Sequence, residues 1–158
     1  MIVIVMRHGE AQGCHTLAGD RYRQLSPNGI KQAQEAAKAI MANPDLKVVQ
    51  VLASNYDRAA QTGAQVAELT QGELSLTPDL SISGEDLHSL ALKLGELEAV
   101  LKENEAVVLV SHIPIVYDLV ELALGKTFAF PFYTASYVVI DYSKKKVIET
   151  SNDAKDRF

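Results

Sequence analysis

Short apolar runs recur along this chain, and segments with the spacing of helices lie between them. Three of these runs, at residues 2–5, 48–52 and 107–110, consist almost wholly of valine, isoleucine and leucine. Such runs are typical of strands that are buried on both faces of a parallel sheet. The segments between them carry leucine or alanine every three or four positions, as amphipathic helices do. The alternation predicts a three-layer α/β/α sandwich around a mostly parallel central sheet.

Capping residue types indicate where the helices begin. Ser26 and Pro27 are the types preferred at an N-cap and at the first position of a helix. Ser54 is expected to cap a second helix over residues 56–69, and Ser83 is expected to open the next one. Each predicted helix therefore starts shortly after a strand or a short loop.

The C-terminal part of the chain has a different pattern. Residues 137–142 and 147–148 are strand-like and are joined by a short polar turn, which predicts a hairpin at an edge of the sheet. Residues 152–158 are polar and are expected to be frayed. Because the chain has 158 residues and no linker, repeat or low-complexity tract, residues 1–158 are expected to form a single domain.

Charge and composition limit the classes of ligand and location. A net charge of −5 and a pI near 5.3 argue against a nucleic-acid-binding protein, which usually has a basic face. No apolar run approaches membrane-spanning length, and the opening run lacks the length and basic flank of a signal peptide. The single cysteine, Cys14, leaves no intrachain disulfide to form. We therefore expect a cytoplasmic protein with no membrane partner, in which an anionic ligand needs a local cationic pocket.

Basic side chains follow each of the three apolar runs. Arg7 and His8 follow the first run, Arg58 lies shortly after the second, and His112 follows the third. The carboxyl ends of parallel strands meet at one edge of a sheet, where open α/β folds bind their ligands. The glycine after His8, Gly9, lets the backbone turn and approach a ligand closely. We expect these side chains to converge on an anion, with the N-termini of two helices adding to the pocket.

The residue types in this predicted pocket suit phosphoryl transfer. Arg7 and Arg58 offer planar forks of donors that bind phosphoryl oxygens bidentately. One imidazole can attack phosphorus in line to give a phosphohistidine that water hydrolyses, and the other can brace the phosphoryl oxygens. The surrounding positive charge is expected to lower the pKa of the attacking imidazole. The sequence has no P-loop and no cluster of metal ligands, so neither a metal nor a cofactor is expected.

Several blocks of the sequence resemble the histidine phosphatase superfamily, which has the phosphoglycerate-mutase-like fold. The short chain is most similar to the SixA branch, the phosphohistidine phosphatases. The matching blocks are Arg7-His8-Gly9, residues 54–62, Val110-Ser111-His112-Ile113-Pro114 and Leu25-Ser26-Pro27-Asn28-Gly29, within a resemblance that runs from Met1 to about Asp141. The resemblance implies that His8 is the nucleophile. It also implies that Arg7, Arg58 and His112 complete the phosphate pocket, with Gly9 beside the substrate.

A general acid is harder to place. Larger members of the superfamily carry an acidic residue in an insertion after the second helix, where this chain has only the short segment 77–86. Asp79, Glu85 and Asp86 lie in that segment, but none matches a family motif. Asp20, in the loop after the first strand, is a further candidate for an acid or a water-positioning residue. Phosphohistidine releases an imidazole, which needs an acid less than an alkoxide does.

The expected function is therefore metal-independent hydrolysis of phosphohistidine on a protein that resembles a phosphotransfer domain. A chain without a large cap would leave its pocket open to so bulky a substrate. Two alternatives remain: a small-molecule phosphomonoesterase of the same superfamily, and a non-catalytic module that binds phosphate or a phosphoprotein.

His15, His88 and Cys14 are expected to have no role in the site. The aromatic residues after the fourth helix either fill the core or form an apolar wall beside the pocket; they are Phe128, Phe130, Phe132 and Tyr133.

Overall fold

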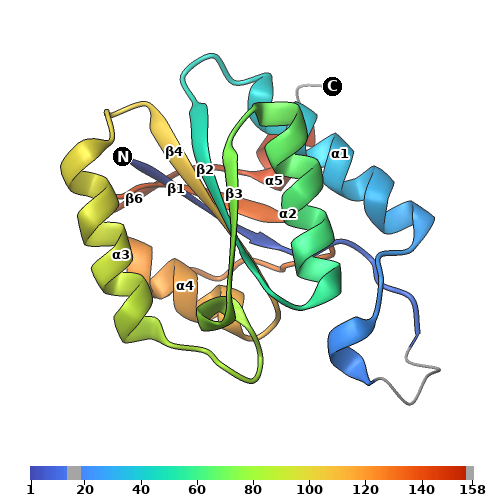
Figure 1. Cartoon of the computed structure of the whole chain (residues 1–158). Coiled ribbons are helices and arrows are strands. Elements are labelled where there is room, and N and C mark those ends of the chain that lie inside the picture. Colours follow the sequence, from blue (N-terminus) through green and yellow to red (C-terminus); the bar gives the residue numbers. More distant parts are fainter. Residues whose placement is uncertain (14–18, 156–158) are drawn as a thin grey trace.

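The computed structural model describes residues 1–13 and 19–155, which form six strands of one sheet with helices on both faces (Figure 1). The strands are β1 Ile2–Arg7, β2 Lys47–Ser54, β3 Glu73–Thr77, β4 Glu105–Ser111, β5 Tyr137–Asp141 and β6 Lys146–Thr150. Their order across the sheet is β3-β2-β4-β1-β5-β6. The pairs among β1 to β4 are parallel, whereas β5 pairs antiparallel with both β1 and β6. The C-terminal hairpin thus lies at one edge, as predicted.

The helices form the two outer layers of the sandwich. On one face lie α1 Pro27–Met41, α2 Asp57–Thr70 and the short α5 Ser151–Lys155. On the other face lie α3 Leu87–Val100 and α4 Ile115–Leu124 (Figure 1). Two 3-10 helices, η1 Asp20–Tyr22 and η2 Pro78–Leu80, lie in the connecting loops. The predicted three-layer α/β/α architecture is confirmed.

Strand β1 shows why the apolar runs of the sequence are unbroken. Val3 and Val5 point into the core beneath α3 and α4, whereas Ile2, Ile4 and Met6 point into the core beneath α1 and α2. All five side chains are buried. A strand covered on both faces has no solvent side that would favour a polar residue.

The first helix begins where its sequence predicts. The Ser26 hydroxyl accepts a hydrogen bond from the backbone N–H of Gly29 over 3.0 Å, and Pro27 occupies the first helical position. Ser54, in contrast, does not cap α2. It is the last residue of β2, and Tyr56 stands at the N-cap position without a side-chain cap. The prediction for Ser54 was wrong because β2 continues through this residue, so its hydroxyl accepts the N–H of Tyr56, ahead of α2, and also bonds to a distant side chain described below.

The start of α3 also differs from the prediction. Ser83 does not open this helix; Asp86 is its N-cap and accepts a hydrogen bond from the backbone N–H of Ser89 over 3.0 Å. The residues before it form a turn, closed by a bond from the Asp86 N–H to the Asp79 carbonyl over 3.1 Å. Because Ser83 lies within this turn, it cannot be the first residue of α3.

The C-terminal residues are more ordered than their polarity suggests. Residues 151–155, expected to fray from 152 onward, form helix α5, which contacts α1. The Ser151 hydroxyl is buried and accepts the backbone N–H of Tyr137 over 3.2 Å. Residues 156–158 lie outside the described part of the chain, as do Cys14 and His15. Within the described part, no helix is long and apolar enough to cross a bilayer.

Candidate active site

The sheet order brings the predicted site residues together. Strands β2, β4 and β1 are consecutive in the sheet and parallel, so their carboxyl ends share one edge. Arg7 lies opposite Ser111 in the β1–β4 register, and the backbone N–H of His8 donates to the Ser111 carbonyl over 3.0 Å. The ring centroids of His8 and His112 are 5.2 Å apart. Arg58, from the first turn of α2, reaches the same place, because its Nε is 3.3 Å from Nε2 of His8.

The hydrogen bonds of His8 define which of its ring nitrogens is free to react. Its Nδ1 lies 2.7 Å from the carbonyl oxygen of Gly9. A carbonyl only accepts hydrogen bonds, so Nδ1 carries the ring proton of the neutral imidazole and Nε2 carries a lone pair. The pKa of His8 is lowered to about 4, first by burial and then by the charges of Arg58 and Arg7, against the raising effect of the hydrogen bond with the Gly9 carbonyl. The ring is therefore neutral near pH 7 and has an available nucleophilic nitrogen.

The backbone of the His8 loop is held from two sides. The N–H of Gly9 donates to the hydroxyl of Thr62 over 3.0 Å, and that hydroxyl donates to the Arg58 carbonyl over 2.7 Å. On the other side the loop packs against α1 at Gly29, where a Cβ would lie 2.0 Å from the carbonyl oxygen of Glu10. This close approach explains the glycine of the Leu25-Ser26-Pro27-Asn28-Gly29 block. The sequence pattern indicates that block, and Thr62 at the end of the 54–62 block, but it does not reveal the contacts of either.

Helix α1 is also tied to the loop through a carboxylate. Glu10 accepts hydrogen bonds from the Ser26 hydroxyl over 2.9 Å and from the Asn28 amide over 3.0 Å. The same Ser26 hydroxyl caps α1. One short segment therefore starts a helix and anchors the loop that carries the candidate nucleophile.

The second histidine, His112, is almost wholly buried, with 1% of its surface exposed. Its Nε2 lies 2.8 Å from the hydroxyl oxygen of Ser54. Its Nδ1 is buried and, among the described residues, has no hydrogen-bond partner. The pKa of His112 is lowered to about 3, first by burial and then by His8 and by the charge of Arg58. This ring too is neutral near pH 7.

The two arginines of the site have different partners. Nη1 of Arg7 donates to the carbonyl of Phe132 over 3.0 Å, and within the described part of the chain its buried Nε has no partner. Arg58 is 3% exposed and donates through both Nη atoms to Asp20: to its carbonyl over 2.8 Å and to its carboxylate over 3.0 Å. A buried donor without a partner is costly. An anion bound beside Arg7 could remove that cost.

Asp20, the candidate acid or water-positioning residue, lies beside Arg58 rather than in open solvent. Its carboxylate also accepts from Arg23 over 3.1 Å, and about half of the side chain is exposed. Partial burial raises its pKa, but the hydrogen bonds from Arg23 and Arg58 lower it by more, so the net shift is downward. At neutral pH Asp20 is a carboxylate, which accepts a proton rather than supplying one.

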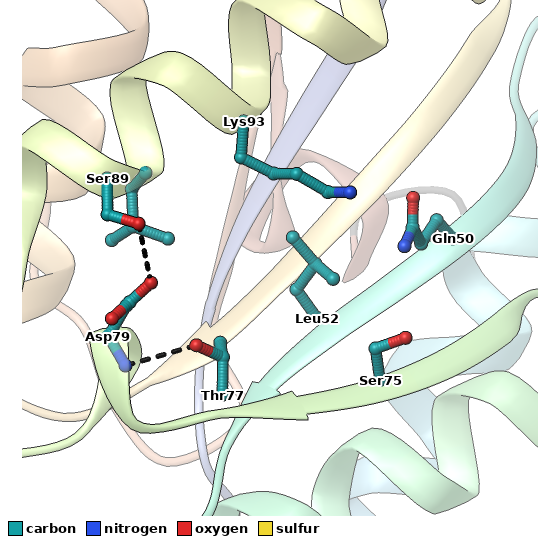
Figure 2. A pocket seen from close by; sticks show the side chains of 8 residues that line it. Gln50, Leu52, Ser75, Thr77, Asp79, Ser89 and Lys93 are labelled. Carbon is teal, nitrogen blue, oxygen red and sulfur yellow. Dashed lines mark hydrogen bonds between the residues drawn. The ribbon is translucent and has the colours of Figure 1, made fainter.

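The carboxyl groups of segment 77–86 have structural partners. Asp79 accepts a hydrogen bond from the Ser89 hydroxyl over 2.8 Å at the rim of a cavity of about 220 Å³ between β2, β3 and α3, which Lys93 also lines (Figure 2). Asp86 caps α3. Glu85 hydrogen-bonds to Asp118 of α4, and its pKa is raised first by partial burial and then by that neighbour. Asp79 and Asp86 are thus each occupied in holding the turn and the start of α3.

The aromatic segment after α4 fills the core, which is one of the two roles left open by the sequence. Phe130 and Phe132 are buried in the core beneath α3 and α4, and Phe128 packs against that core. The neighbouring Tyr133 is 65% exposed. Since the carbonyl of Phe132 binds Arg7, the segment supports the site from the core and places an aromatic ring at the surface nearby.

The described residues form no cluster of metal-ligand types. Over residues 1–13 and 19–155, no three His, Cys, Asp or Glu side chains come together as a set that could hold a metal ion. The groups that converge at the sheet edge are instead hydrogen-bond donors and imidazoles, which suit an oxyanion.

Comparisons with known proteins agree with this geometry. The model of the histidine phosphatase superfamily (branch 1) matches residues 3–81. A phosphohistidine phosphatase SixA homolog from Haemophilus influenzae is 28% identical over 156 residues, which cover 94% of this chain and 93% of that protein. The solved structure of the protein histidine phosphatase SixA complexed with tungstate is 28% identical, with a TM-score of 0.77 over 95% of this chain and 96% of that one.

A phosphatase structure with a different bound ligand shares the fold. A mutant phosphoserine phosphatase from Entamoeba histolytica in complex with phosphoserine is 20% identical, with a TM-score of 0.65 over 99% of both chains. At that identity the likeness concerns the fold alone.

Proposed function

Since the chain belongs to the histidine phosphatase superfamily, and is therefore a hydrolase, we propose that it hydrolyses phosphohistidine on a protein through a covalent phosphohistidine on His8. The observation that carries the proposal is the tautomer of His8. Its Nδ1–H donates to the Gly9 carbonyl, its Nε2 lone pair lies 3.3 Å from Nε of Arg58, and its ring centroid lies 5.2 Å from that of His112.

In the first step the Nε2 lone pair of His8 attacks phosphorus in line. A new N–P bond forms, the P–N bond of the substrate breaks, and its electron pair stays on the departing ring nitrogen. A substrate imidazole that is protonated on its other nitrogen leaves as a neutral ring. Arg7, Arg58 and His112 stabilise the negative charge that spreads over the phosphoryl oxygens.

In the second step water attacks the phosphoryl group on His8. The P–N bond breaks, its electron pair returns to Nε2, and inorganic phosphate and a proton are released. Because Nδ1 keeps its proton against the Gly9 carbonyl, His8 also leaves as a neutral imidazole. The hydrogen bond that prepares the nucleophile therefore prepares the leaving group of the second step as well.

Two features favour a phosphohistidine protein over a phosphate ester. A phosphate ester expels an alkoxide and benefits from a general acid. Asp20 is ionised at neutral pH, Asp79 and Asp86 hold the α3 turn, and Glu85 is hydrogen-bonded to Asp118 of α4. Large apolar side chains are also exposed next to site residues: Ile113 follows His112 and is 42% exposed, and Tyr133 follows Phe132. Such side chains suit contact with a protein.

The test compares phosphate release from a phosphohistidine protein and from a simple phosphate ester, with no metal added. The variants are His8→Ala and, as the control, His88→Ala, which removes an exposed histidine of α3. We expect rapid release from phosphohistidine that is lost in His8→Ala alone, with an acid-labile phosphoenzyme trapped in the wild type.

The other outcomes separate the alternatives. Hydrolysis of the ester alone would overturn the proposed substrate in favour of a small-molecule phosphomonoesterase. A folded protein that binds phosphate but releases none from either substrate would be a binding module. Turnover that persists in His8→Ala would exclude His8 as the nucleophile.

A further inference from the structure

Ser54 is the buried partner of the second histidine. It is the last residue of β2 and has no exposed surface. Its hydroxyl oxygen lies 2.8 Å from Nε2 of His112 and accepts the backbone N–H of Tyr56 over 3.2 Å. A serine hydroxyl has a single hydrogen to donate. Its oxygen has two lone pairs, one of which accepts from Tyr56, and among the described residues Nε2 of His112 is the acceptor within reach of the hydroxyl hydrogen.

The state of His112 depends on where that hydrogen goes. A neutral imidazole has one N–H and one lone pair. If Ser54 donates to Nε2, the ring proton lies on Nδ1, the buried nitrogen that has no partner among the described residues. In the opposite tautomer Nδ1 would be a lone pair, which repels the oxygens of a phosphoryl group.

We propose that Ser54 donates its hydroxyl hydrogen to Nε2 of His112 and thereby holds the ring proton on Nδ1, where it donates to a phosphoryl oxygen. Ser54 is then a positioning residue, because it acts through His112. The proposal rests on the proposed function only for the identity of the ligand. The location of the ring proton is a property of the free protein.

The two histidines would then have opposite roles although each carries its ring proton on Nδ1. The Gly9 carbonyl holds a proton on Nδ1 of His8, so that Nε2 offers a lone pair to phosphorus. Ser54 directs a proton to Nδ1 of His112, so that this nitrogen offers a donor. The rings lie 5.2 Å apart, and neither needs a positive charge for its role.

The packing around His112 leaves its orientation little freedom. The Tyr56 ring meets it edge-on at a centroid distance of 5.2 Å, and the carbonyl of His112 accepts the Val116 N–H over 2.9 Å at the start of α4. A ring that is 1% exposed and packed against Tyr56 has little room to turn over and compensate for the wrong tautomer. The hydroxyl of Ser54 is therefore the group that selects the tautomer.

The test reads the ring proton directly. Long-range ¹H–¹⁵N correlation spectra, with the His112 signals assigned from a His112→Asn variant, distinguish a protonated Nδ1 from a protonated Nε2. We expect protonated Nδ1 in the wild type and a shift toward protonated Nε2 in Ser54→Ala. We also expect kcat/KM to fall about 100-fold in that variant, the usual cost of one lost oxyanion donor.

Ser111→Ala is the matched control. Ser111 is also the last residue of a central strand and is fully buried, but its hydroxyl donates to the Leu80 carbonyl over 2.7 Å and to no ring. We expect this variant to lose stability while the His112 tautomer stays as in the wild type. Ser54→Thr, which keeps a hydroxyl, should retain the wild-type tautomer.

Two results would overturn the proposal. One is a wild-type spectrum that places the ring proton of His112 on Nε2. This measurement does not depend on whether any variant folds. The other is a Ser54→Ala variant with the wild-type tautomer. Neither result depends on turnover, so a failure of the proposed substrate and a failure of this inference are told apart.

Discussion

Nε of Arg58 donates a hydrogen bond to Nε2 of His8 over 3.3 Å. A buried guanidinium thus lies against the nitrogen that we propose attacks phosphorus, and the remaining nitrogens of that guanidinium bind Asp20. The contact holds the lone pair in place and disfavours protonation of the ring. When a phosphoryl group enters, the N–H groups of Arg58 are suitably placed to donate to its oxygens in place of their present acceptors.

Replacing this guanidinium by an ammonium group should impair catalysis. Arg58→Lys keeps the charge but removes the fork of donors, and we expect kcat/KM to fall about 100-fold or more. Arg23→Lys is the control, since within the described part of the chain Arg23 shares Asp20 with Arg58 but hydrogen-bonds to neither histidine. Steady-state kinetics of both variants check the prediction. Equal losses of kcat/KM in the two variants would mean that activity depends on the ion pair with Asp20 and not on donors to the phosphate.

The buried histidines should make stability depend on pH. In the folded protein the pKa values of His8 and His112 are about 4 and about 3, against an ordinary value of 6.5. Between pH 6.5 and about 4 the unfolded chain therefore binds protons that the folded chain does not. The free energy of unfolding should fall as the pH falls, by roughly 1.4 kcal/mol per pH unit for each ring.

Urea unfolding across that pH range provides the measurement. The comparison is between the wild type and His112→Asn, because acidic groups contribute to the slope of both proteins and cancel in the difference. We expect a shallower decline in the variant. Parallel curves for the two proteins would show that His112 is not buried in its neutral form.

Two glycines should respond to alanine in opposite ways. In Gly29→Ala the new Cβ would lie 2.0 Å from the Glu10 carbonyl oxygen, so α1 and the His8 loop must separate. We expect a loss of about 2–4 kcal/mol in stability together with a loss of activity. In Gly95→Ala no atom lies within 4 Å of the new Cβ, and a helix interior favours alanine by about 0.5–1 kcal/mol. Thermal unfolding and turnover measure both effects, and similar shifts would contradict the packing described.

Removing the Asp20 carboxylate should strengthen anion binding. In the free protein that carboxylate occupies Nη2 of Arg58, and a phosphate has to compete for the same donor. Asp20→Ala is expected to tighten binding of inorganic phosphate by roughly fivefold, equivalent to about 1 kcal/mol for a partly exposed ion pair. Titration calorimetry measures the affinity. Weaker binding in the variant would indicate that Asp20 supports the pocket instead of competing with its ligand.

The location of the candidate site could be predicted from the sequence because it follows from topology. Arg7, Arg58 and His112 each lie at or just beyond a run that the sequence marks as a buried strand, and parallel strands in one sheet end at one edge. Only the general position is fixed in this way. The prediction that Ser54 caps α2 was wrong for a related reason: local sequence favours a cap, but the hydroxyl bonds to a residue 58 positions away.

The amino-acid sequence by itself determined the layers, the strand positions and the meeting of two arginines and two histidines at one sheet edge, because hydrophobic period and strand direction are local properties. Only the tertiary structure decided which atoms meet. Gly9 and Thr62 are 53 positions apart, and Arg58 and Asp20 are 38 apart. A hydrogen bond requires its two atoms within about 3 Å and in line. Local patterns do not specify distances of that kind across the chain, so the tautomers of the two histidines and the partner of Asp20 depend on how the packed layers fit together.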